Sequence, residues 1–170
     1  MGIRLLPLSL QELYAHALIL ERDASIRFEA LARCMRDAGI DHLAEEFEQI
    51  GKEEREQYEL LAVGTAGRGL PEIQPWEYAW HFCGPAGDVI AAPTTARDVL
   101  ALALSAERRT ESFYADVAEH VDDDAVSAFA AEMAIDESRH VERLERLLAR
   151  EPAPEALDGG LLGADVLPVR

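Results

Sequence analysis

Apolar residues recur along four stretches of the chain at alternating intervals of three and four, the spacing that places side chains on one face of an α-helix. A glutamate interrupts each apolar face near its middle. In chain order the faces are Leu10, Tyr14, Ala17, Glu21, Ala24, Phe28, Leu31 and Met35; Leu43, Phe47, Ile50, Glu54, Gln57 and Leu61; Leu100, Ala103, Glu107, Thr110, Tyr114, Val117 and Val121; and Val126, Ala130, Met133, Glu137, His140, Leu144 and Leu147. The pattern predicts four long amphipathic helices, each turning one carboxylate inward.

Capping and turn residues place the ends of the first two predicted helices. Ser9 followed by Glu12 has the pattern of a capping box, and Gly39 is a typical residue at the C-terminus of a helix. We expect Asp41 to cap the second helix, which continues to about Val63. Because the connection between them is short, the two helices are predicted to form an antiparallel hairpin.

The last two predicted helices form a second hairpin. Thr95 and Asp98 repeat the capping pattern at the start of the third helix. This helix is predicted to end at the acidic run 122–124. The same aspartates favour the N-terminus of the fourth helix, where the helix dipole attracts negative charge. The fourth helix is predicted to end near Arg150, ahead of Pro152.

Residues 65–93 join the two hairpins. They show no helical periodicity and contain glycines and prolines at short intervals, which is typical of a connecting segment. A crossover of this length spans the bundle and makes the third helix parallel to the second. Residues 75–83 hold both tryptophans, and we expect a short helix there, packed on the bundle or on a partner subunit. The predicted fold class is all-α: a four-helix bundle of two antiparallel hairpins over residues 1–150. Residues 151–170 form a C-terminal tail, either docked or disordered.

The four inward glutamates need a compensating positive charge. An unpaired buried carboxylate costs roughly several kcal/mol, whereas a whole domain is stable by about 5–15 kcal/mol. None of the apolar faces contains Arg or Lys, so we expect a bound cation rather than an arginine to neutralise them. Carboxylate oxygens with an imidazole nitrogen suit iron, manganese or zinc. The alternative for Glu137 and His140 is a hydrogen-bonded core pair, and we expect the hydroxyls of Tyr14 and Tyr114 to contact the ligand carboxylates.

Several other polar residues lie off the apolar faces. We expect His16, His42 and His120 to face solvent. Glu56 and Glu111 point about 100° away from the inward positions beside them, because successive residues of an α-helix are rotated by that angle. These two glutamates are therefore predicted to be surface charges.

Length and charge narrow the range of functions. A chain of 170 residues with 49% hydrophobic residues suits one domain with its own core. A net charge of −17 disfavours nucleic acid and anionic membranes as partners, since both are bound through Lys and Arg. No segment has the pattern of a signal peptide or a membrane span, and Cys34 and Cys83 suit a reducing compartment, so we expect a cytoplasmic protein. The two cysteines form no Cys-x-x-Cys pair, which excludes a rubredoxin-type iron centre within this chain.

The two predicted hairpins are similar to each other in sequence. Ala-Leu-Ile-Leu-Glu-Arg at residues 17–22 is repeated as Ala-Leu-Ser-Ala-Glu-Arg at residues 103–108, and the Glu-Arg-Glu-Gln run of residues 54–57 corresponds to Glu-Ser-Arg-His at residues 137–140. One glutamate from each of two helices and a Glu-x-x-His pattern from the others characterise ferritin-like di-iron proteins. The chain resembles that superfamily, most closely its rubrerythrin-type branch, over about residues 9–150.

The resemblance implies a dinuclear iron site inside the bundle. By this resemblance Glu21 and Glu107 would each be a terminal ligand. Glu54 and Glu137 would bridge the two metal ions, and His140 would bind one of them. We therefore expect two iron ions, with manganese or zinc as alternatives.

Two positions depart from the family pattern. Gln57 stands where the family has its second histidine, and Thr110 stands where rubrerythrins carry a further glutamate. Both departures concern the same metal ion, which leaves the ion near His140 better supported than its neighbour. The predicted metal ligands are Glu21, Glu54, Gln57, Glu107, Glu137 and His140. For Gln57 the alternative is a buried amide that hydrogen-bonds a carboxylate.

Two functions are compatible with these residues. The first is a di-iron oxidoreductase acting on peroxide, oxygen or ferrous iron, with electrons supplied by the iron itself or by a separate electron-donor protein. The second is a non-catalytic helical bundle with a degraded or mononuclear metal site that serves a binding, storage or interaction role, favoured by Gln57 and Thr110. The long amphipathic helices and the aromatic crossover also favour a homodimer.

Overall fold

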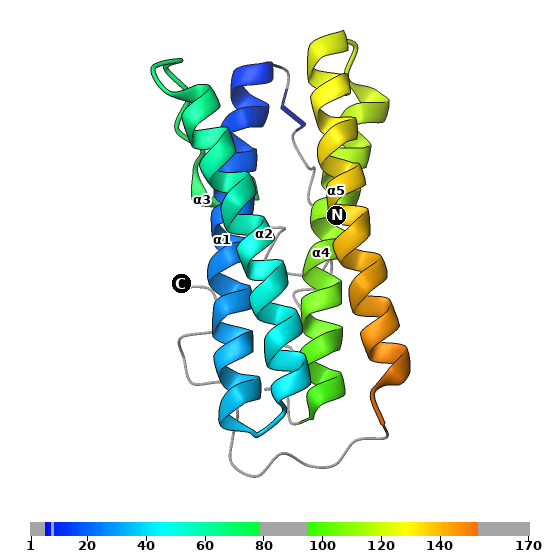
Figure 1. Ribbon diagram of the computed structural model, residues 1–170. Coiled ribbons are helices and arrows are strands. Elements are labelled where there is room, and N and C mark those ends of the chain that lie inside the picture. Colours follow the sequence, from blue (N-terminus) through cyan, green and yellow to red (C-terminus); the bar gives the residue numbers. More distant parts are fainter. Residues whose placement is uncertain (1–5, 8, 79–94, 153–170) are drawn as a thin grey trace.

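The computed structural model describes residues 6–7, 9–78 and 95–152, and almost all of them are helical (Figure 1). The helices are α1 (Leu10–Asp37), α2 (Asp41–Thr65), α3 (Pro75–Tyr78), α4 (Ala96–His120) and α5 (Asp124–Arg150). No strand occurs among the described residues. The predicted all-α fold with four long helices is confirmed.

Two of the four long helices begin with the capping boxes that the sequence predicts, and a third begins at the acidic run that was expected to favour its N-terminus. The Ser9 side chain accepts a hydrogen bond from the Glu12 amide at 3.2 Å, while the Glu12 carboxylate accepts one from the Ser9 amide at 3.2 Å. Thr95 and Asp98 make the same reciprocal pair at 3.1 and 3.0 Å. Asp123, from the acidic run, caps α5. These bonds satisfy amides that have no partner within the helix.

The predicted Asp41 cap is wrong. Ile40 is the N-cap of α2, and Asp41 is the first helical residue and makes no capping hydrogen bond. The reason is the turn that ends α1, where Gly39 has a φ of +74° and the Ile40 amide donates to the Met35 carbonyl at 2.8 Å. Because this Schellman-type turn closes at Ile40, the second helix begins immediately after it.

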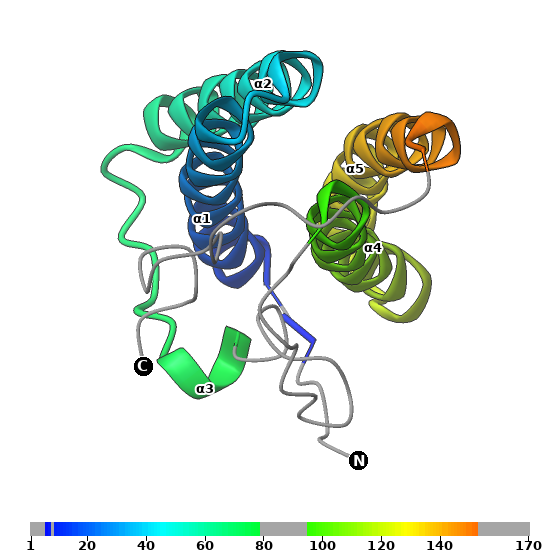
Figure 2. The same ribbon diagram turned by 90° about the horizontal axis from the view of Figure 1, so that it is seen from below.

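The helices form two antiparallel hairpins, α1–α2 and α4–α5, that lie side by side (Figures 1 and 2). Helix α2 rises from the lower end of the bundle in Figure 1, and α4 rises in the same direction. The crossover therefore makes α4 parallel to α2, as predicted. This arrangement faces the inward side of one hairpin toward the inward side of the other.

The bundle interior consists of two hydrophobic clusters with a polar layer between them. The cluster near the α1–α2 turn comprises Phe28, Leu31, Ala32, Met35, Leu43, Ala44, Phe47, Ile50, Ala96, Val99, Leu100, Ala103, Leu104, Val141 and Leu144. The cluster at the opposite end comprises Leu13, Ala17, Leu20, Leu61, Phe113, Tyr114, Val117, Val126, Ala130 and Met133. Apolar burial at both ends fixes the helices, and so holds the polar side chains of the middle layer in place.

The prediction that three histidines face solvent holds for His42 and His120 and is wrong for His16. His16 is only 5% exposed. Its Nδ1 lies 2.9 Å from the Glu12 carbonyl, and its ring packs 5.6 Å from that of Phe113. Because the carbonyl one turn earlier satisfies the imidazole, the ring can be buried at the edge of the apolar face.

Part of the crossover and the tail lie outside the described residues. Helix α3 begins where a short helix was expected, but none of its residues is buried, and Trp76 is 74% exposed. The remainder of the predicted segment, 79–83, lies outside the described residues, as does the tail from residue 153. Within the described part of the chain, no helix has the length and apolar character needed to cross a membrane.

Candidate metal centre

The four predicted inward glutamates lie in the polar layer, one from each long helix. Glu21, Glu54, Glu107 and Glu137 are 3%, 1%, 0% and 3% exposed. Each lies on the apolar face of its helix, so the packing of the two hydrophobic clusters directs all four carboxylates into the same interior. The burial that helical periodicity predicts for these residues is confirmed.

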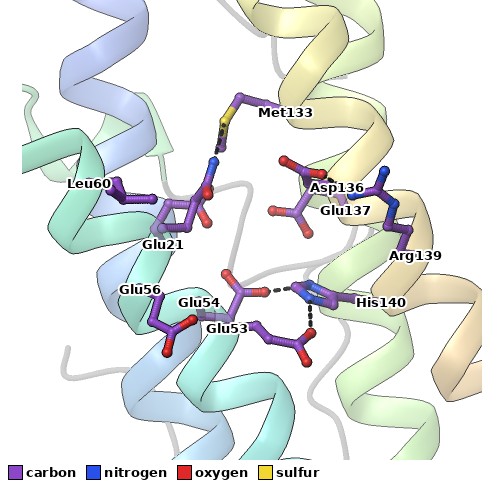
Figure 3. A pocket seen from close by; sticks show the side chains of 11 residues that line it. Glu21, Glu53, Glu54, Glu56, Leu60, Met133, Asp136, Glu137, Arg139 and His140 are labelled. Carbon is purple, nitrogen blue, oxygen red and sulfur yellow. Dashed lines mark hydrogen bonds and ion pairs between the residues drawn. The ribbon is translucent and has the colours of Figure 1, made fainter. Parts of the chain in front are cut away.

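Four of the predicted ligands form a compact group. One ligand atom from each of Glu54, Glu107, Glu137 and His140 lies within 4.8 Å of the others. His140 Nδ1 lies 2.6 Å from Glu54 Oε1 and 3.7 Å from Glu107 Oε2. Figure 3 shows His140 pointing from α5 toward Glu54 on α2.

Glu21 lies beside this group rather than within it. It lines the same cavity as Glu54 and Glu137, but it does not share the 4.8 Å group. The Tyr114 hydroxyl donates a hydrogen bond to Glu21 Oε1 at 2.9 Å. The predicted contact between this tyrosine and a candidate ligand carboxylate is confirmed, and it orients Glu21.

Gln57 and Thr110 make other contacts. Gln57 lines the cavity, and its amide nitrogen donates to the sulfur of Met133 at 3.4 Å. Thr110 is buried, and its hydroxyl lies 3.4 Å from the Ala106 carbonyl of its own helix. At the two positions where the resemblance implies additional charged or imidazole ligands, the chain thus offers a neutral amide and a hydroxyl.

The compact group fits a bound metal ion because several of its buried polar atoms have no hydrogen-bond partner. Both oxygens of Glu54, one oxygen each of Glu107 and Glu137, and Nδ1 of His140 have no hydrogen bond. The 2.6 Å approach of His140 Nδ1 to Glu54 is an ion-pair distance without the alignment of a hydrogen bond. Buried polar atoms are normally paired, and oxygen and nitrogen donors this close together suit a divalent transition metal.

The carboxylates respond to their crowding in opposite ways. Burial, and then the charge of Glu54, raises the pKa of Glu21 well above its ordinary value of 4.5. Burial and the neighbouring carboxylates likewise raise the pKa of Glu137. Burial also raises the pKa of Glu107, but His140 and Arg27 outweigh it and hold the pKa at about 2. Without a metal, protons thus provide part of the charge compensation.

The histidine supplies a positive charge of its own when no metal is bound. Burial lowers the pKa of His140, but the carboxylates of Glu107 and Glu54 outweigh it and raise the pKa to about 11. A metal that binds Nδ1 must therefore displace a proton, because the imidazole ligates in its neutral form.

An arginine also reaches the polar layer, contrary to the sequence-based expectation. Arg27 lies beside Phe28, just off the apolar face of α1, and its guanidinium contacts Glu107 Oε1 at 2.8 Å. The Arg27 side chain is 14% exposed. For Glu107 the expectation was wrong, because helical periodicity locates the Cα of a residue, whereas a long arginine side chain can extend around the helix to a buried carboxylate. Arg27 thus compensates the negative charge of Glu107.

Glu53 and Arg143 hold the outer side of the His140 ring. Its Nε2 lies 3.2 Å from Glu53 Oε2, and the other oxygen of Glu53 lies 3.4 Å from Arg143. The arrangement turns Nδ1 inward and lets Nε2–H donate to a carboxylate, as metal-bound histidines commonly do. Sequence reasoning missed Glu53, and the only signal was its position next to Glu54.

A cavity of about 340 Å³ connects this layer to the surface between α2 and α5. Its inner wall contains the buried Glu54 and Glu137, and its outer part contains the exposed Glu56. The polar layer is therefore accessible to small solutes.

The helical hairpins and their buried carboxylate–histidine group define a ferritin-like bundle. The Rubrerythrin family matches residues 12–148, and the chain belongs to this family. Among solved structures, an uncharacterized conserved protein from Magnetospirillum magnetotacticum is 25% identical and has a TM-score of 0.76, with 86% of this chain and 98% of that chain covered. No curated protein matches the sequence. The resemblance noted in the sequence is confirmed.

Proposed function

We propose that this protein is a di-iron oxidoreductase that acts on peroxide, oxygen or ferrous iron at the polar layer. The observation that carries the proposal is the compact group of Glu54, Glu107, Glu137 and His140, whose buried ligand atoms lie within 4.8 Å of one another and largely lack hydrogen bonds. Membership of the Rubrerythrin family makes iron the first candidate for the metal.

The compact group would hold the first ion, and Glu21 and Gln57 would complete the second site together with Glu54 and Glu137. Iron bound there would supply the electrons that reduce the oxidant. The protein's own contribution is positional: Tyr114 orients Glu21, and the two hydrophobic clusters on either side of the layer hold its side chains in place. A separate electron-donor protein would return electrons where ferrous iron is not itself the substrate.

A second candidate function is a non-catalytic bundle that binds a single ion for storage or interaction. Two contacts favour it. The Gln57 amide donates to Met133, and Arg27 already engages one oxygen of Glu107. The first leaves the second ion with a weak ligand, since a neutral amide binds metal less strongly than a carboxylate or an imidazole. The second engages one oxygen of the compact group and so reduces the ligand atoms that the group can offer to metal ions.

Metal analysis followed by an oxidation assay separates the two candidates. Purified protein is loaded with ferrous iron without oxygen, its iron content is measured, and the optical change on adding peroxide or oxygen is recorded. Two irons per chain with repeated turnover support the oxidoreductase. One ion per chain without turnover supports the single-ion bundle. A protein that binds neither iron nor any other divalent metal contradicts both.

A further inference from the structure

The cavity between α2 and α5 is markedly acidic. Six of its lining residues are carboxylates: Glu21, Glu53, Glu54, Glu56, Asp136 and Glu137. Its basic lining residues are Arg139 and His140, and both already contact carboxylates. Figure 3 shows the labelled acidic side chains on both walls, on α2 and on α5, with Glu21 contributed by α1.

The acidic residues extend from the solvent to the buried layer. At the outer part, the side chains of Glu56 and Asp136 are 59% and 43% exposed. Glu53 is intermediate, with 39% exposure. At the inner end, Glu54 and Glu137 are almost completely buried. A solute that moves inward therefore meets carboxylates over the whole distance.

Unpartnered oxygens at the inner end indicate what the cavity receives. Glu54 is 1% exposed and lines the cavity; its Oε1 lies 2.6 Å from His140 Nδ1, whereas its Oε2 and one oxygen of Glu137 have no hydrogen-bond partner. Surface carboxylates alone would indicate only a solvated acidic patch. Buried oxygens without partners, at the inner end of that patch, indicate a positively charged ligand.

From this geometry we infer that the α2–α5 cavity is the uptake route for divalent cations into the polar layer, with Glu56 and Asp136 attracting the ion at its outer end. The inference rests on the proposed function and deepens it, because it names a divalent cation, ferrous iron in the first instance, as the species that the protein takes up from solution. A cleft lined by one sign of charge concentrates ions of the opposite sign and accelerates their association. Neutral peroxide and oxygen gain nothing from this field.

The roles of the outer and inner carboxylates differ kinetically. Glu56 and Asp136 act on the approach of the ion and therefore on the association rate. Glu54 and Glu137 hold the ion and therefore govern its dissociation. Removing the outer charges should slow uptake by about tenfold at low ionic strength and by much less at high ionic strength, where the charges are screened. The double change also leaves Arg139 without its Asp136 partner, which adds a repulsive charge.

The test measures the uptake of Co²⁺, which is stable in air and gives an optical signal when bound. Metal-free wild-type protein and the double variant Glu56→Gln/Asp136→Asn are mixed rapidly with Co²⁺ at low and high ionic strength. The matched control, Glu119→Gln/Asp122→Asn, also removes two negative charges, but from exposed positions at the C-terminal end of α4 and in the turn after it. Because all four positions are at least partly exposed, thermal melts should confirm that both variants fold normally.

The expected result is slower uptake in the cavity variant alone, with the difference reduced at high ionic strength. Equal rates in the two variants, or equal slowing of both, would overturn the uptake route while leaving the metal centre intact. Failure of the wild-type protein to bind Co²⁺ or Fe²⁺ would overturn the proposed function together with the inference. The two failures are thus distinguishable.

Discussion

At the scale of single residues, the centre depends on how His140 is held. Its inner nitrogen faces Glu54 and its outer nitrogen contacts Glu53, which also contacts Arg143. Neighbours of this kind fix the ring orientation and the tautomer of a metal-binding histidine. Glu53 is thus a positioning residue, although it lies off the apolar face of α2.

Replacing Glu53 with glutamine tests this positioning role. The amide keeps the size of the side chain but removes the charge that holds the imidazole and Arg143. We expect the dissociation constant for Co²⁺ to rise by about tenfold, measured by equilibrium titration. Glu119→Gln, which removes a charge far from the site, should leave the constant unchanged. Equal affinity in both variants would show that Glu53 does not orient the histidine.

Replacing Gln57 with histidine tests the weaker half of the site. An imidazole is a stronger ligand than the neutral amide that contacts Met133. The change should raise the number of metal ions bound per chain or tighten the weaker site, as measured by metal analysis after dialysis against limiting metal. Gln11→His, at an exposed position near the start of α1, provides the control. Unchanged stoichiometry and affinity would contradict the assignment of Gln57 to the site.

At the scale of helices, Gly51 sets how closely α2 approaches α1. A Cβ at this buried position would lie only 3.1 Å from the Phe28 Cβ and 3.5 Å from the Ser25 carbonyl. A larger residue would push the two helices apart one turn before Glu54. The glycine costs helix propensity but permits the close packing that places this glutamate.

Gly51→Leu should therefore destabilise the fold and weaken the site. Overpacking of this kind costs about 1–3 kcal/mol, measurable as a lower midpoint in chemical denaturation, and metal affinity should fall with it. Gly64→Leu is the control, because a Cβ at this exposed position of α2 meets nothing within 4 Å. If both variants were equally stable, the α1–α2 contact would not be tight.

At the scale of the whole molecule, the metal-free fold depends on protons. The raised pKa values of Glu21 and Glu137 and the raised pKa of His140 mean that the folded state binds protons more tightly than the unfolded chain. The stability contributed by such groups is fully present below their unfolded pKa values and is lost as the pH rises through their folded values. The contribution of Glu107 to stability has the opposite sign, because its pKa is lowered to about 2. This contribution is lost only as the pH falls toward that value.

The metal-free protein should therefore become less stable as the pH rises from about 5 to about 9. Metal-loaded protein should lose less stability over this range, because metal binding displaces protons and is favoured at higher pH. Thermal melts of chelator-treated and reloaded protein measure both slopes. A melting temperature that rises with pH in the metal-free protein would contradict the assigned pKa shifts.

Residues with a local or periodic signature could be predicted from the sequence. Ser9 and Thr95 were found as caps because capping boxes depend on neighbours three residues away. Two residues whose positions depend on contacts across the fold were not found. His16 was expected in solvent and is buried against Phe113, and Arg27 reaches Glu107 from a different helix.

By itself, the sequence determined the four helices, their pairing in hairpins, and the inward direction of four glutamates and one histidine, because the helical repeat and capping chemistry act over a few residues. Only the tertiary structure decided that Glu54, Glu107, Glu137 and His140 form one compact group while Tyr114 holds Glu21 beside it. It alone also created the acidic cavity between α2 and α5. These features arise where side chains from separate hairpins meet, and their distances depend on how the hydrophobic clusters pack.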